Sequence, residues 1–86
     1  MQVILTSKAN EDLIYWKKSG NKAILKKIDS LIESIIAAPC TGIGKPEALK
    51  HSFWGLWSRR IDREHRIVYR VEESIIEIYS LRGHYN

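Results

Sequence analysis

The most regular hydrophobic pattern of the chain lies between residues 22 and 36. Apolar residues recur there at helical spacing: Ile24, Ile28, Leu31 and Ile35. The opposite side carries charged residues: Lys22, Lys26, Asp29 and Glu33. This pattern predicts an amphipathic α-helix whose apolar side belongs in a core. Pro39 disfavours helical backbone at Ala38, so we expect the helix to end there.

A shorter helical pattern precedes it. Its apolar residues are Ala9, Leu13 and Trp16. Thr6 and Ser7 are good N-caps for this helix, and Gly20-Asn21 is suited to end it and to cap the next one. We therefore expect two helices in an antiparallel hairpin that covers a sheet.

Four short segments are rich in β-branched or aromatic residues and predict strands: residues 3–5, 56–61, 66–71 and 75–81. Polar turns join the last three, which indicates an antiparallel meander. Residues 39–52 contain two prolines and two glycines and predict a long loop, a feature that is often functional. The fold class is therefore α+β, a small twisted antiparallel β-sheet with two N-terminal α-helices packed on one face. Its 86 residues make a single domain, 1–86.

In the strand expected at 66–71, successive side chains should point to opposite faces of the sheet. Ile67, Tyr69 and Val71 should meet the helices, which leaves Arg66 and Arg70 on the open face. Arginines are frequent nearby, at Arg59, Arg60, Arg63, Arg66 and Arg70. With a net charge of +4, the chain favours an anionic partner, nucleic acid before a membrane surface.

Several classes of protein are disfavoured. No apolar run approaches the length of a membrane span, and the apolar part of the N-terminus is too short for a secretory signal. Cys40 is the only cysteine, so neither a disulfide framework nor a cysteine zinc site is expected. The acidic residues show no metal-ligand spacing. We expect a cytoplasmic protein with no cofactor and no metal site.

Side chains in the stretch from Gly44 to His51, together with two outside it, are of the types that metal-free RNA cleavage needs. RNA brings its own nucleophile, the 2′-OH beside the scissile phosphate. Cleavage then needs a base, an acid for the departing oxygen, and cations for the charge on phosphorus. Glu47, His84 and the pair of Lys50 and Arg66 have these side-chain types.

Other interpretations of these residues stay open on spacing alone. Glu47 in a basic loop is more often a salt-bridge partner than a base, and His84 near the chain end is more often a residue of a frayed tail. His51 and His65 are assigned to the surface. At the level of the whole chain, the alternatives are a protein that binds a protein target such as gyrase without cutting RNA, and a basic RNA- or ribosome-binding module without catalysis.

Five motifs resemble the YoeB/Txe toxins of the RelE superfamily: Gly44-Lys45-Pro46-Glu47, Leu49-Lys50-His51, Trp57-Ser58-Arg59-Arg60-Ile61, Glu64-His65-Arg66 and Arg82-Gly83-His84-Tyr85. The likeness runs over essentially the whole chain. It implies a RelE-like fold, also called microbial-RNase-like. It also implies a ribosome-dependent mRNA interferase that cuts message in the decoding A site without a metal.

The resemblance also implies residue roles. Glu47 matches the general base and His84 the general acid, while Lys50 and Arg66 match the residues that stabilise phosphate charge. Tyr85 matches an aromatic residue that holds the substrate nucleotide. The expected RNA contacts are Lys45, Arg59 and Arg60. The implied partners are mRNA on the 70S ribosome, a cognate antitoxin of the YefM/Axe type and a second copy of the chain in a homodimer.

Overall fold

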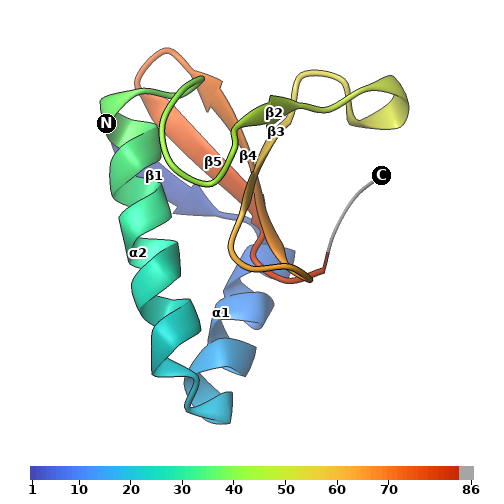
Figure 1. Ribbon diagram of the computed structural model, residues 1–86. Helices are drawn as coiled ribbons and strands as arrows, with labels where there is room; N and C mark the ends of the chain where they lie inside the picture. The colour runs from blue at the N-terminus through green and yellow to red at the C-terminus, as the bar shows by residue number, and fades with distance from the viewer. Residues whose placement is uncertain (84–86) are drawn as a thin grey trace.

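A computed structural model describes residues 1–83 of the chain (Figure 1). The elements in chain order are β1 (Gln2–Leu5), α1 (Ser7–Ser19), α2 (Lys22–Ala37), β2 (Glu47–Ala48), the 3-10 turn η1 (His51–Phe53), β3 (Trp57–Arg60), β4 (Arg66–Glu72) and β5 (Ile75–Ser80). Two helices and a five-stranded sheet confirm the α+β class. None of the helices within residues 1–83 is long and apolar enough to cross a membrane.

Both helices begin and end where the sequence predicted. The Thr6 hydroxyl accepts a hydrogen bond from the Ala9 amide at 3.2 Å and caps α1, and the Asn21 side chain caps α2 through the Ile24 amide at 3.1 Å. Between them Gly20 has φ of 70°, a left-handed conformation that glycine adopts without a steric penalty. Local capping chemistry therefore fixes the helical hairpin.

The sheet has the strand order β1-β5-β4-β3-β2. The meander of β3, β4 and β5 is antiparallel as predicted, whereas β1 pairs with β5 in parallel, so the sheet is mixed. A parallel pair requires a long connection between its strands. Here the helical hairpin and the other strands together supply that connection (Figure 1).

The segment 39–52, expected to be only a loop, contains β2 and η1. Strand β2 pairs with β3, placing Glu47 opposite Ser58 and Ala48 opposite Trp57. Two exposed residues carry too little hydrophobic pattern to be recognised as a strand. This short pairing nevertheless joins the loop to the edge of the sheet, beside the open face.

The helices cover one face of the sheet, and the core lies between these two layers. Ile28, Leu31 and Ile35 of α2 pack with Ile67 and Tyr69 of β4, as the alternation predicted. Val68 was expected on the open face and is also buried, in a cavity lined by Phe53 and Leu56. The segment after β2 thus covers part of the face opposite the helices.

Leu31→Ala is expected to lower the free energy of unfolding by about 2–5 kcal/mol, since it removes a fully buried side chain from α2. Urea denaturation measures the change. Ile36→Ala on the same helix is the control, because Ile36 is 42% exposed and loses less burial. Equal effects of the two substitutions would contradict the assignment of the buried side of α2.

Candidate catalytic pocket

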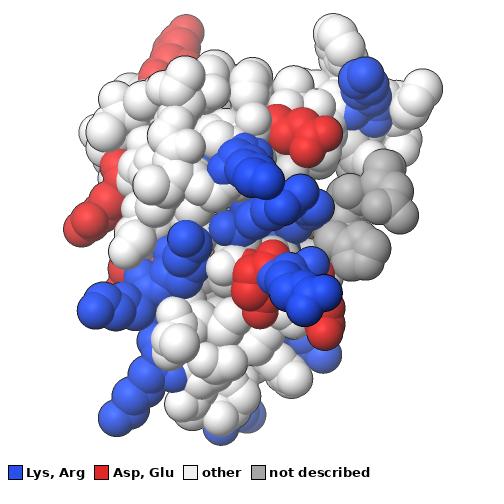
Figure 2. Space-filling model, viewed as in Figure 1, with Lys and Arg blue, Asp and Glu red and all other residues white. Residues whose placement is uncertain are grey.

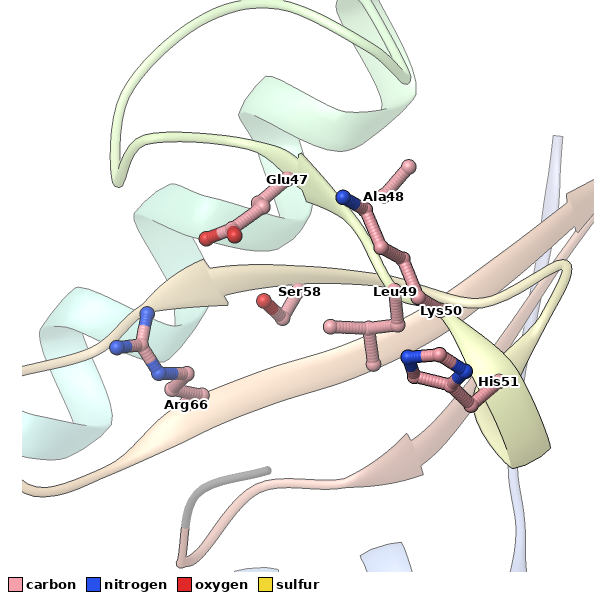
Figure 3. Close-up of a pocket in the computed structure, with 7 residues that line it drawn as sticks. All are labelled: Glu47, Ala48, Leu49, Lys50, His51, Ser58 and Arg66. Atoms are coloured by element: carbon pink, nitrogen blue, oxygen red, sulfur yellow. The ribbon is translucent and has the colours of Figure 1, made fainter. Parts of the chain in front are cut away.

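A pocket lies on the face of the sheet opposite the helices. Its lining comes from the segment 47–51, which runs from β2 to the start of η1, and from β3 and β4: Glu47, Ala48, Leu49, Lys50, His51, Ser58 and Arg66 (Figure 3). Residues directly opposite one another on paired strands project to the same face. The pairs Glu47–Ser58 and Arg60–Arg66 therefore place their side chains on this face of the sheet.

Glu47 and Arg66 reach the pocket from two different strands, β2 and β4. Figure 3 shows the Glu47 carboxylate and the Arg66 guanidinium at the same end of the pocket, to one side of Ser58. No partner within 4.0 Å forms an ion pair with either side chain in the part of the chain that the structure describes. The expectation that Glu47 serves as a local salt-bridge partner is therefore not met. Within residues 1–83, both charged groups thus line the pocket without an ion-pair partner.

Two further basic or titratable side chains line the same space. Lys50 and His51 follow Glu47 by three and four residues and lie on the other side of the pocket from Arg66 (Figure 3). The sequence analysis assigned His51 to the surface. His51 is exposed, but it also lines the pocket. Its position directly after Lys50 could have indicated this from the sequence.

The loop before Glu47 is fixed by a close approach of backbone to α2. The Gly44 carbonyl accepts a hydrogen bond from the Arg60 amide at 2.6 Å. Gly44 has φ of 82°, and a Cβ at this position would lie 2.7 Å from Leu31 Cδ2, so only glycine fits. Pro46 then restricts the backbone immediately before the acid. These constraints hold Glu47 at the edge of the sheet.

The prediction that Arg59 contacts RNA is wrong. Arg59 has 0% of its surface exposed and lies on the helix side of the sheet. Its guanidinium donates hydrogen bonds to five acceptors: Ser34 Oγ at 2.7 Å, the carbonyls of Ala38 at 2.6 Å, Thr41 at 2.8 Å and Ile43 at 3.3 Å, and Tyr69 Oη at 3.0 Å. Arg59 is therefore a structural residue that holds the 38–43 loop.

Tyr69 completes this buried network. Its hydroxyl accepts from Arg59 Nε and donates to the Pro39 carbonyl at 2.7 Å. Burial raises the pKa of Tyr69 above its ordinary value of 10.0, so the phenol is neutral at physiological pH and can donate. The loop that leads to the pocket is thus tied to the core on its inner side.

The other predicted RNA contacts, Lys45 and Arg60, are exposed. Arg60 pairs with Arg66 across β3 and β4 and so shares the open face. Figure 2 shows lysine and arginine side chains gathered across the middle of the viewed face, with acidic side chains beside them. Of the predicted catalytic residues, Glu47, Lys50 and Arg66 line one pocket, and His84 and Tyr85 lie outside the described residues.

Comparison with known proteins agrees with the fold and with the motifs. The model of the YoeB-like toxin of bacterial type II toxin–antitoxin systems matches residues 5–85. Toxin YoeB of Escherichia coli strain K12 is 44% identical over 85 residues, which cover 99% of this chain and 100% of that protein.

Solved structures give the same result. A YoeB/ParE toxin from Agrobacterium tumefaciens superposes with a TM-score of 0.94 at 39% identity, over 99% of this chain and 100% of that one. A Staphylococcus aureus YoeB has been solved as a dimer, with a TM-score of 0.91 at 41% identity, and in a complex with YefM, with a TM-score of 0.90 at 42% identity. Both superpositions cover 99% of this chain and 98% of the S. aureus chain.

These matches define a toxin of a bacterial type II toxin–antitoxin system. Within that class, the chain belongs to the YoeB-like toxin family, as its motifs predicted.

Proposed function

We propose that this toxin is an endoribonuclease that cleaves messenger RNA in the ribosomal A site and so inhibits translation. The observation that carries the proposal is the pocket in which Glu47, Lys50 and Arg66 meet on the open face of the sheet. A carboxylate and two cations are suited to remove a proton from a hydroxyl beside a phosphate and to stabilise the charge that develops. Membership of the YoeB-like family supports a toxic activity.

In the proposed reaction the RNA supplies its own nucleophile. Glu47 takes the proton from the 2′-OH, and the 2′ oxygen attacks the adjacent phosphorus. The bond from phosphorus to the 5′ oxygen then breaks, and His84 gives its proton to that oxygen. The products are a 2′,3′-cyclic phosphate and a 5′-hydroxyl, and solvent returns both side chains to their starting protonation states. DNA lacks the 2′-OH and is not cut.

The basic residues act on charge and position. Arg66 and Lys50 offset the negative charge on the phosphoryl oxygens, and the planar guanidinium of Arg66 can bind two of them at once. Tyr85 holds the substrate nucleotide, while Lys45 and Arg60 contact neighbouring phosphates. Within residues 1–83 no three His, Cys, Asp or Glu side chains gather as metal ligands. We assign charge stabilisation to Arg66 and Lys50, which line the pocket.

The partners in this proposal are the translating ribosome in the cytoplasm, an antitoxin and a second copy of the toxin. The S. aureus relative has been solved both as a dimer and with YefM. We propose that a YefM-type antitoxin silences this chain and that the chain forms a homodimer. An antitoxin would silence it most directly by covering the open face, where the pocket lies.

His84→Ala is expected to lower cleavage of mRNA about 100-fold or more, because the departing 5′ oxygen loses its proton donor. Primer extension on a defined message in purified ribosomes measures cleavage at the A-site codon. Arg63→Ala is the control, since Arg63 is exposed in the turn between β3 and β4 and does not line the pocket.

Cleavage that persists in His84→Ala would move the acid to His51 or to solvent. If neither the wild type nor the variant cut the message and ribosome binding were retained, a non-catalytic module would replace the nuclease. DNA damage on expression, without cut message, would instead indicate a target such as gyrase.

A further inference from the structure

Residues 81–83 of the chain are held at every position by side chains from distant elements. Leu81 is bound on both sides of its backbone: its amide donates to Asp12 Oδ2 at 2.9 Å, and its carbonyl accepts from Trp16 Nε1 at 2.8 Å. Arg82 stacks on Tyr15, with Cζ 3.6 Å from the ring centroid. Helix α1 therefore fixes the chain immediately after β5.

Gly83 is bound by the segment that precedes and begins β4. Its amide donates to His65 Nδ1 at 2.9 Å, and its carbonyl accepts from the Arg66 amide at 2.8 Å. These two hydrogen bonds hold both polar groups of the Gly83 backbone. The Arg66 side chain meanwhile lines the pocket, so a single residue joins the pocket to Gly83.

His65 is itself held in place by its neighbours. Its ring lies edge-on against Trp16, with centroids 4.9 Å apart and an angle of 80° between the planes. Its backbone amide donates to Asp62 Oδ1 at 2.7 Å. Because Nδ1 accepts from Gly83, the proton of the neutral ring belongs on Nε2, which lies 3.4 Å from Glu64 Oε2. The imidazole thus presents an acceptor in a fixed direction.

We propose that His65 is a positioning residue: through Nδ1 it fixes Gly83, the residue that directly precedes the proposed general acid His84. The inference rests on the proposed function, in which His84 is the general acid. A proton donor contributes to catalysis only when it is held at hydrogen-bonding distance from the leaving oxygen. No local pattern predicts this role, because the contact joins residues 18 positions apart.

Two substitutions separate the effect of the hydrogen-bond acceptor of His65 from the effect of its ring. His65→Phe keeps a ring against Trp16 and removes the acceptor, whereas His65→Asn loses the ring and places an amide oxygen near the position of Nδ1. We expect His65→Phe to lower kcat about 10- to 100-fold at little changed KM, since a small misplacement of a reacting group has effects of that size. His65→Asn should recover most of the loss.

The two variants are compared in single-codon cleavage assays on ribosomes, after their thermal unfolding has been checked. If His65→Phe cuts at the wild-type rate, or if His65→Asn is as impaired as His65→Phe, the positioning role is overturned. Should His65→Phe fail to fold, His65→Gln takes its place, because its amide reaches the position of Nε2 and leaves Gly83 without an acceptor.

A measurement without RNA separates this inference from the proposed function. Hydrogen exchange of the Gly83 amide, followed by NMR on the free protein, should be faster in His65→Phe than in the wild type and in His65→Asn. An unchanged exchange rate in His65→Phe would show that the hydrogen bond to His65 Nδ1 does not hold the Gly83 amide. A wild-type protein that shows slow exchange and cuts no message would instead overturn the proposed nuclease function.

Discussion

Arg66→Ala is expected to reduce mRNA cleavage about 1,000-fold while changing the free energy of unfolding by about 0.5 kcal/mol or less. The guanidinium lines the pocket and has no ion pair within the described part of the chain, so its loss leaves no charged group unpaired. The transition state for cleavage, however, loses its planar cation. Arg66→Lys should restore part of the activity, because it returns the charge without the two-pronged geometry.

Single-turnover cleavage on ribosomes measures the effect, and urea denaturation checks stability. Arg63→Ala removes the same charge from outside the pocket and controls for general attraction to RNA. Equal losses in the two variants would show that net charge, and not the pocket, governs activity. Full activity of Arg66→Ala would exclude this pocket as the site of chemistry.

Arg59→Ala, unlike Arg66→Ala, is expected to act mainly on stability. It should lower the free energy of unfolding by about 3–5 kcal/mol. The substitution leaves five acceptors without their donor, among them the buried Tyr69 Oη, and opens a cavity beneath the 38–43 loop. Arg59→Lys should rescue little, because one ammonium group cannot reach acceptors arranged around a planar guanidinium.

Urea unfolding of Arg59→Ala beside Arg60→Ala tests this expectation on adjacent residues. Arg60 is exposed on the open face, so its substitution should change stability by about 0.5 kcal/mol or less and weaken RNA binding. Similar unfolding curves for the two variants would contradict the structural assignment of Arg59. The pair thus separates a buried arginine that holds the fold from an exposed one on the open face.

The helices were predictable because their signals are local. The periodic stripe of α2 and the caps Thr6 and Asn21 are properties of a few consecutive residues. The parallel pairing of β1 with β5 was not predictable in the same way, since it depends on how the whole chain returns to its first strand. Strand β2 is too short to show a pattern.

The candidate site was predictable in part. The strand register brings Glu47 and Arg66 to one pocket, although their catalytic roles stay predictions. Strand alternation does predict that Arg59 points toward the core. It places Arg59 on the same side of β3 as Trp57, which packs against the core. The contact between His65 and Gly83 had no local signal.

The position of β5 in the sheet has a consequence for synthesis of the toxin. Of the described strands β1 is made first, yet its only partner among them is β5, which is made after all the others. The same late segment supplies the Leu81 backbone that Asp12 and Trp16 bind. The nascent chain therefore cannot close its sheet before β5 has been synthesised, and a product truncated before β5 would lack the partner of β1. The arrangement delays the folded toxin until β5 has left the ribosome.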